Sequence, residues 1–136
     1  MKHATKRFAF AALPLAALMA VPAAATERSA AGQTELAELL EGRVAGEPVN
    51  CIRESSSDGV QIVDGTAMVF RRGATLYVNR PDGAQALDHW DLPVFEKRGG
   101  TGLCRLDHVT LYDRGATIPG PTLFLAEFVP YTKPAR

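Results

Sequence analysis

After residue 48, the chain consists of short runs in which apolar and polar residues alternate, separated by turn-forming residues. The clearest unit spans residues 63–84. Two strand-like runs in it, 66–71 and 74–80, are separated only by Arg72-Gly73, and both are rich in residue types that fit a pleated, half-buried surface. Gly73 can take the positive φ that a tight turn needs. The pattern therefore predicts a β-hairpin.

Six further short runs predict strands on both sides of this hairpin. They are bounded by turn residues and lie at residues 49–53, 60–63, 84–87, 92–95, 103–112 and 122–131. Pro93 makes the run 92–95 an edge strand or an extended loop, because proline cannot donate to a central ladder. Strands at this spacing predict a mainly β (α+β) fold, namely a small antiparallel β-barrel or sandwich with one short N-terminal helix.

The helix is predicted just before the first strand. Its apolar residues recur at helical spacing and form one stripe: Leu36, Leu39, Leu40 and Val44. Thr34 is placed to cap the helix N-terminus, and Gly46 is placed to end it, with Gly42 as an earlier alternative. Residues 26–33 are small and polar and are predicted to form a flexible N-terminal arm.

The first 25 residues have the pattern of a signal peptide. Three basic residues precede an apolar stretch, residues 8–21, and Ala23-Ala24-Ala25 provides the small-residue pattern that signal peptidase cleaves. The apolar stretch is too short to span a bilayer comfortably. We expect cleavage before Thr26, which leaves residues 34–136 as a single β-rich domain behind the arm.

Removal of the signal peptide changes the charge of the protein. The whole chain has 15 Lys+Arg and 15 Asp+Glu; the signal region holds three basic and no acidic residues, which leaves a formal charge of −3 on the mature part. A weakly acidic protein has no bulk attraction to nucleic acid or to an anionic membrane. We expect a periplasmic or secreted protein with no nucleic-acid partner and no transmembrane anchor after cleavage.

The two cysteines, Cys51 and Cys104, are predicted to form a disulfide, because export favours oxidation. Both lie in apolar, strand-like runs, which suits a bridge between neighbouring strands. The alternative is a metal or redox pair, but the two residues are far apart in sequence and no CxxC motif is present.

Five runs of this sequence resemble an uncharacterised family of small exported bacterial proteins. They are LLEGRVAGEPVNCI, VDGTAMV, TLYVNRPDGA, LCRLDHV and AEFVPY, and YVNRP together with FVPY is the most specific combination. The resemblance covers residues 39–131. It implies export, one domain and the pairing of Cys51 with Cys104, and it implies no activity. The chain differs from the family pattern at His89 and His108, where the family has no histidine.

Carboxylates and imidazoles occur together at two places, and they are the candidate metal ligands. Asp88, His89 and Asp91 form one group, and Asp107-His108 forms the other. Together they would suit zinc or manganese if the fold brought them together. However, neighbouring residues of a strand point to opposite faces, so Asp107 and His108 do not suit one site. A solvated cluster is the simpler interpretation, and no cofactor is expected.

Two other segments lack the features of a catalytic motif. Ser55, Ser56 and Ser57 lie in a turn without the strand-to-helix elbow of a nucleophilic serine. The glycine-rich loop 99–102 lacks the lysine and hydroxyl that end a phosphate-binding loop.

The predicted hairpin carries a local basic patch with an aromatic neighbour: Arg71, Arg72, Arg80 and Tyr77. Such a patch suits a phosphate, a carboxylate or an acidic partner. The simpler interpretation is that arginines at a hairpin tip prevent edge-to-edge aggregation. Trp90 is predicted to cover the core.

These observations favour a non-catalytic interaction module that binds an envelope protein or peptide. The alternative is a small hydrolase or metal-dependent enzyme that uses the aspartate and histidine groups. The two hypotheses predict different structures, because the enzyme requires Asp88, His89, Asp91 and His108 to converge in one cleft.

Overall fold

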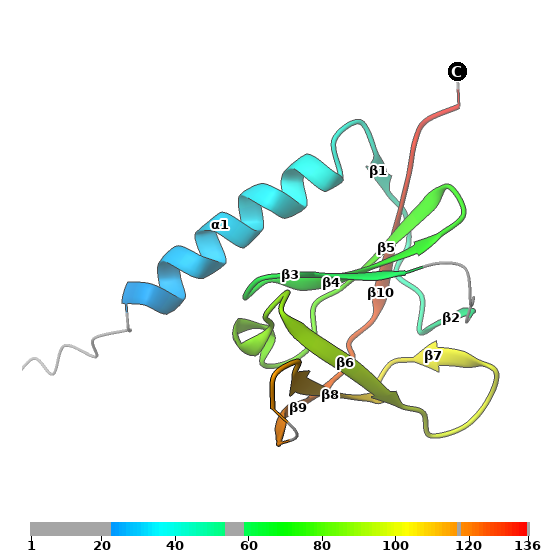
Figure 1. Cartoon of the computed structure of the whole chain (residues 1–136). Helices are drawn as coiled ribbons and strands as arrows, with labels where there is room; N and C mark the ends of the chain where they lie inside the picture. The colour runs from blue at the N-terminus through cyan, green and yellow to red at the C-terminus, as the bar shows by residue number, and fades with distance from the viewer. Residues whose placement is uncertain (1–22, 54–58, 117, 136) are drawn as a thin grey trace, which may run out of the picture.

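The computed structural model describes residues 23–53, 59–116 and 118–135, with side chains from residue 28 onward (Figure 1). Most of the predicted signal peptide and the serine-rich turn 54–58 lie outside the described residues. The elements are, in order, α1 (Ala23–Leu39), β1 (Val44–Ala45), β2 (Cys51–Arg53), β3 (Val60–Val63), β4 (Ala67–Arg72), β5 (Thr75–Asn79), the 3₁₀ helix η1 (Ala84–Ala86), β6 (Asp91–Glu96), β7 (Gly102–Cys104), β8 (His108–Asp113), β9 (Pro119–Phe124) and β10 (Phe128–Thr132).

The strands form three antiparallel sheets. The largest has the order β1-β10-β5-β4-β3, and the others are β6-β8-β9 and β2-β7. Helix α1 lies on one side of the five-stranded sheet, and the two smaller sheets lie on its other side (Figure 1). The predicted mainly β, antiparallel fold with one helix is therefore confirmed, in its sandwich-like form.

Two hydrophobic clusters cover opposite faces of the five-stranded sheet. Along β4, Met68 and Phe70 point into the larger cluster, whereas Ala67 and Val69 point into the cluster under α1. This alternation follows from the period of two along a strand. Because both faces are buried, these strands are almost continuously apolar, as in a sheet covered on both sides.

The predicted hairpin is formed by β4 and β5. Gly73 has φ +58° at its tip, in the left-handed region that favours glycine. The YVNRP and FVPY runs meet in the sheet: β5 pairs with β10, with Asn79 opposite Phe128 and Tyr77 opposite Pro130.

The helix differs from its prediction at both ends. Residues 26–33, predicted as a flexible arm, are helical, and Thr34 is not an N-cap but donates to the carbonyl of Ala30 within the helix. The arm is ordered because it packs against the turn after β3, a long-range contact that local pattern does not reveal. Of the two glycines predicted to end the helix, the earlier one, Gly42, is correct, because it has φ +70° just after the helix. Val44, predicted in the apolar stripe of the helix, lies instead in β1 and is 58% exposed.

Two predicted strands are each divided into two. Residues 103–112 form β7 and β8, and the chain turns between them at Leu106, which has φ +70°. The buried carboxylate of Asp107 stabilises this turn, because it accepts hydrogen bonds from the backbone N–H groups of Arg98 and Cys104. Residues 122–131 are divided in the same way between β9 and β10.

Three other expectations concern the segment after the hairpin. The run 84–87, predicted as a strand, contains the 3₁₀ helix η1. The proline-containing run forms β6, which is an edge strand as predicted. Trp90, predicted to cover the core, is 61% exposed, because it lies in the connection between η1 and β6.

The predicted disulfide joins Cys51 and Cys104, which face each other across β2 and β7. The flanking pair Ile52 and Leu103 is buried in the larger cluster. The bridge therefore fastens the two-stranded sheet at one end of the core. No helix within the described residues is long and apolar enough to cross a membrane.

Candidate functional site

Two of the predicted metal-ligand candidates, Asp88 and His89, lie beside Asp64 at the end of β3. His89 Nδ1 lies 2.9 Å and 3.0 Å from the two carboxylate oxygens of Asp64, and the backbone N–H of His89 donates to the same carboxylate at 2.6 Å. The ligand atoms of Asp64, Asp88 and His89 all lie within 4.8 Å of one another. Asp64 was not among the predicted site residues, because its Asp-Gly sequence is also that of an ordinary turn.

Hydrogen bonds and ion pairs account for the positions of these three side chains. Asp88 accepts the backbone N–H of Trp90 at 2.9 Å and forms an ion pair with Arg28 of α1. The Trp90 hydrogen bond and Arg28 hold the pKa of Asp88 below its usual value. The hydrogen bond to Asp64 raises the pKa of His89, with help from neighbouring carboxylates.

The other two metal-ligand candidates do not belong to this group of three. Asp91 begins β6 opposite Asp113, whereas His108 pairs with Glu96 at the far end of the same ladder. Five residue steps along a strand correspond to about 17 Å. The His108 ring instead packs edge-on against a phenylalanine ring, Phe124, at 4.6 Å. The fold therefore does not bring the four predicted residues into one cleft.

The four binding candidates of the hairpin lie on both faces of the sheet. Tyr77 packs against the larger cluster, on the opposite face of β5 from Arg80, whose guanidinium donates to Gln33 of α1 at 3.4 Å. Arg72 donates to the carbonyl of Arg53 at 2.6 Å and lies over the Phe70 ring. Arg71 is exposed on the α1 side.

The feature that stands out instead is the free edge of β3. This strand pairs with β4 alone, and the register makes Gly59 and Arg71 a hydrogen-bonded pair. Because such pairs alternate, the N–H and C=O groups of Val60 and Ile62 point away from β4. These four backbone groups have no partner within the described part of the chain.

The other sheet edges are short or interrupted by proline. Strand β1 has two residues, β2 and β7 have three each, β6 contains Pro93, and β9 contains Pro119 and Pro121. Proline and short length both protect an edge from pairing. Among the described strands, β3 is therefore the one edge of four residues or more that lacks such protection. Its sequence, VQIV, carries neither proline nor charge, and this was the signal available in the sequence.

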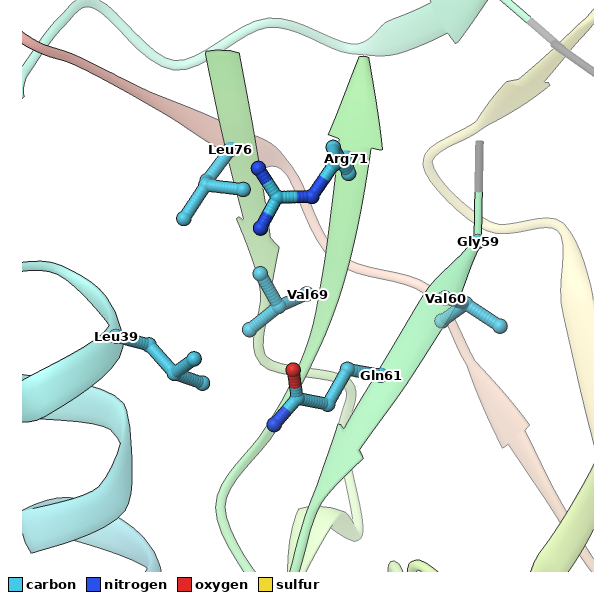
Figure 2. Close-up of a pocket in the computed structure, with 7 residues that line it drawn as sticks. All are labelled: Leu39, Gly59, Val60, Gln61, Val69, Arg71 and Leu76. Carbon is cyan, nitrogen blue, oxygen red and sulfur yellow. The ribbon is translucent and has the colours of Figure 1, made fainter. Parts of the chain in front are cut away.

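Two hollows that share Val60 and Gln61 as lining residues lie along β3, and we call the two together the β3 groove. One part is lined by Glu35 of α1, by β3 residues, by Asp64 and by His89. A second part is a hollow of about 190 Å³ between α1 and the sheet. Figure 2 shows Leu39 of α1 facing Val69 across this hollow, with Gln61 at its border. The groove thus combines an exposed strand edge with a hollow lined by both apolar and polar side chains.

Comparisons with models of protein families, with curated proteins and with solved structures found no match to this chain. The function therefore has to be argued from the geometry described above.

Proposed function

We propose that this protein is an exported, non-catalytic interaction module that binds an extended segment of an envelope protein or peptide in the β3 groove. The observation that carries the proposal is the unpaired edge of β3 at the groove. An extended peptide that adds to a sheet edge gains main-chain hydrogen bonds, and adjoining hollows select its side chains. Val60 and Ile62 offer two donors and two acceptors for such a partner.

Export to the periplasm or the cell exterior is part of the same proposal. It is supported by the signal-like N-terminal pattern and by the Cys51–Cys104 disulfide, since disulfides persist in oxidising compartments. The contacts that Arg28, Ser29 and Glu35 of α1 make with the rest of the fold lie after the predicted cleavage point, so cleavage before Thr26 would retain them.

The groove supports binding better than it supports hydrolysis. A hydrolase or metal-dependent enzyme built on the predicted aspartates and histidines would need His108 beside Asp88, His89 and Asp91, and the β6–β8 ladder places His108 at the opposite end from Asp91. The cluster of Asp64, Asp88 and His89 forms hydrogen bonds and ion pairs within the chain. One of these is the ion pair between Asp88 and Arg28.

A Val60→Pro variant tests the proposal. Proline at position 60 removes an N–H that points away from β4, so the native ladder is retained and only the free edge is blocked. The matched control is Val60→Thr, which keeps the N–H and the β-branched shape. Both variants should show the wild-type circular dichroism spectrum.

The measurement is selection of peptides from a random phage-displayed library on the wild-type protein. We expect selected peptides that bind the wild type and Val60→Thr but lose binding to Val60→Pro at least tenfold. If no selected peptide distinguishes Val60→Pro from the wild type, the β3 edge is not a binding site and the proposal is wrong.

A further inference from the structure

We infer that the occupant of the β3 groove is an extended peptide with a basic side chain at the Asp64 end and an aliphatic side chain at the Gly59 end, the two on the same face of the peptide strand. This inference rests on the proposed function and names the chemistry of its partner. It follows from the different character of the two ends of the groove.

The Asp64 end of the groove is acidic. Glu35 and Asp64 line it directly, and Asp88 lies next to Asp64. The cations nearby are Arg28, which is paired with Asp88, and His89, whose charge depends on pH. Carboxylates therefore exceed fixed positive charges at this end, which favours a lysine or arginine side chain of the partner.

Two ionisable groups respond to this excess of negative charge. Glu35, Asp64 and Asp88 all act to raise the pKa of His89. Burial raises the pKa of Asp91, and repulsion from Asp88, Asp113 and Asp64 adds to it. Both shifts are in the direction that a negative local potential produces.

Three apolar side chains line the Gly59 end of the groove. Leu39, Val69 and Leu76 form its walls, and Val69 and Leu76 belong to the buried cluster under α1. The hollow of about 190 Å³ has room for one aliphatic side chain. Arg71 and Gln61 lie at its border, where polar groups suit the backbone of a bound peptide (Figure 2).

The spacing of the two ends sets the spacing of the two side chains. Glu35 and Leu39 are one helical turn apart on α1, about 6 Å along the axis, whereas Val60 and Asp64 are about 14 Å apart along an extended strand. These limits correspond to two and four residues of an extended peptide. An even number also keeps both side chains on one face, whereas a spacing of three would place them on opposite faces.

A second copy of this chain fits the groove less well than a peptide does. The β3 edge lies beside Glu35 of α1 and His89 of the η1–β6 connection. In a symmetric dimer each β3 edge would carry these neighbours into the other edge. A single extended strand carries no such neighbours.

Isothermal titration calorimetry of the exported protein tests the inference. The probes are capped seven-residue peptides of alternating threonine and valine that carry one lysine and one leucine. The leucine is placed two, three or four residues after the lysine or before it, because the strand direction is not assumed. In parallel sets, glutamate replaces lysine, or threonine replaces leucine.

We expect the best peptide to have an even spacing and to bind at least tenfold more tightly than its glutamate or spacing-of-three counterpart. Glu35→Lys should weaken the binding of that peptide at least fivefold. Glu38 is exposed and does not line the groove, so Glu38→Lys should leave the binding affinity unchanged. Val60→Pro should abolish binding.

The possible contrary results separate the inference from the proposed function. Equal binding of lysine and glutamate peptides, with loss in Val60→Pro, overturns the inference and leaves the proposed function standing. If these probes do not bind but the phage selection yields Val60-dependent peptides of other composition, the inference is likewise overturned and the proposed function stands. Binding that Val60→Pro does not weaken overturns both. A dimer seen by sedimentation in the wild type and lost in Val60→Pro would assign the groove to a second copy and overturn the inference.

Discussion

At the scale of single residues, the side chain of Asn79 forms hydrogen bonds with both polar backbone groups of Ala126. It is fully buried, its amide Nδ2 donates to the carbonyl of Ala126 at 2.7 Å, and its Oδ1 accepts the N–H of Ala126 at 3.1 Å. These two bonds hold the connection between β9 and β10 against β5. The asparagine in the YVNRP run therefore has a structural role that its sequence context alone does not indicate.

Replacing Asn79 with alanine is expected to destabilise the fold by about 2–3 kcal/mol, because both polar groups of Ala126 lose their partner in a part-buried place. Urea denaturation measures the change. The matched control is Asn50→Ala, an exposed asparagine, for which a change within about 0.5 kcal/mol is expected. A loss for Asn79→Ala no greater than that of the control would contradict this role.

His89 should make stability depend on pH near neutrality. Its pKa is raised in the folded state above the usual 6.5, chiefly by the hydrogen bond to Asp64. A raised pKa means that the protonated form stabilises the fold, so this contribution is complete below about pH 6.5 and is lost as the pH rises through the folded-state pKa. The groups facing His89 are Asp64, Asp88 and Glu35, with Arg28 on Asp88.

The urea midpoint of the wild type should therefore decrease as the pH is raised above 6.5, and His89→Ala and Asp64→Asn should each remove most of that decrease. NMR titration of the His89 ring reports the same pKa directly. An unchanged slope in both variants would show that another group is responsible.

At the scale of elements, α1 is the wall of the groove, and its position depends on Gly32. A Cβ atom on this residue would lie 2.2 Å from the carbonyl oxygen of Asp64 and 2.2 Å from Oγ1 of Thr66. Glycine thus allows the helix to approach the turn after β3. Next to it, Glu35 accepts a hydrogen bond from Gln61, and Leu36 is buried under the helix.

Gly32→Ala should be destabilising even though alanine is the better helix former. Alanine favours an isolated helix over glycine by about 1 kcal/mol, but the contact with a backbone carbonyl forces a shift that costs about 1–3 kcal/mol. The net effect expected in urea denaturation is a loss of up to about 2 kcal/mol.

The matched control for this prediction is Gly59→Ala. A Cβ at Gly59 meets nothing within 4 Å, and its φ is outside the left-handed region. The free energy of unfolding of the Gly59→Ala variant should differ from that of the wild type by no more than about 0.5 kcal/mol. A Gly32→Ala variant that is more stable than the wild type would show that α1 can move away from the turn at no cost.

At the scale of the whole molecule, the disulfide joins the two strands of the smallest sheet, which lie far apart in the sequence. Cys51 and Cys104 are 53 residues apart in sequence, and the closed loop contains β3, β4, β5 and β6. A cross-link over such a loop stabilises mainly by restricting the unfolded chain, by about 4 kcal/mol at most. That is a large share of the 5–15 kcal/mol typical of a domain.

The double variant Cys51→Ser with Cys104→Ser should therefore lose up to about 4 kcal/mol in urea denaturation while keeping the β-sheet spectrum. Reduction of the wild type should give the same shift of the midpoint. Intact-mass measurement of the native exported protein before and after alkylation checks the bridge itself, since two free thiols would contradict it.

Local pattern was sufficient for a large part of the fold. The β4–β5 hairpin, strand β3, the edge position of β6 and the Cys51–Cys104 pair were all predicted, because each depends on residues close in sequence or on two cysteines with no other partner. The breaks inside 103–112 and 122–131 were missed, because the apolar run continues across them. They occur where Asp107 accepts a hydrogen bond from Arg98, which precedes β7, and where Asn79 of β5 holds Ala126.

The candidate site could be predicted only in part. His89 and Asp88 were singled out by residue type, but their partners Asp64 and Arg28 come from other parts of the chain. The hairpin arginines and Tyr77 were grouped because they are close in sequence, and the alternation along the strands divides them between two faces.

The sequence by itself determined the periodicity and the turns of this protein, and therefore its β-rich class, its hairpin and its disulfide, because these depend on backbone preferences and on neighbouring residues. Only the tertiary structure decided which strand edge is left unpaired, which charges meet and where α1 lies. Those features depend on the order of strands and on long-range packing, which local patterns do not encode. The β3 groove belongs to this second group.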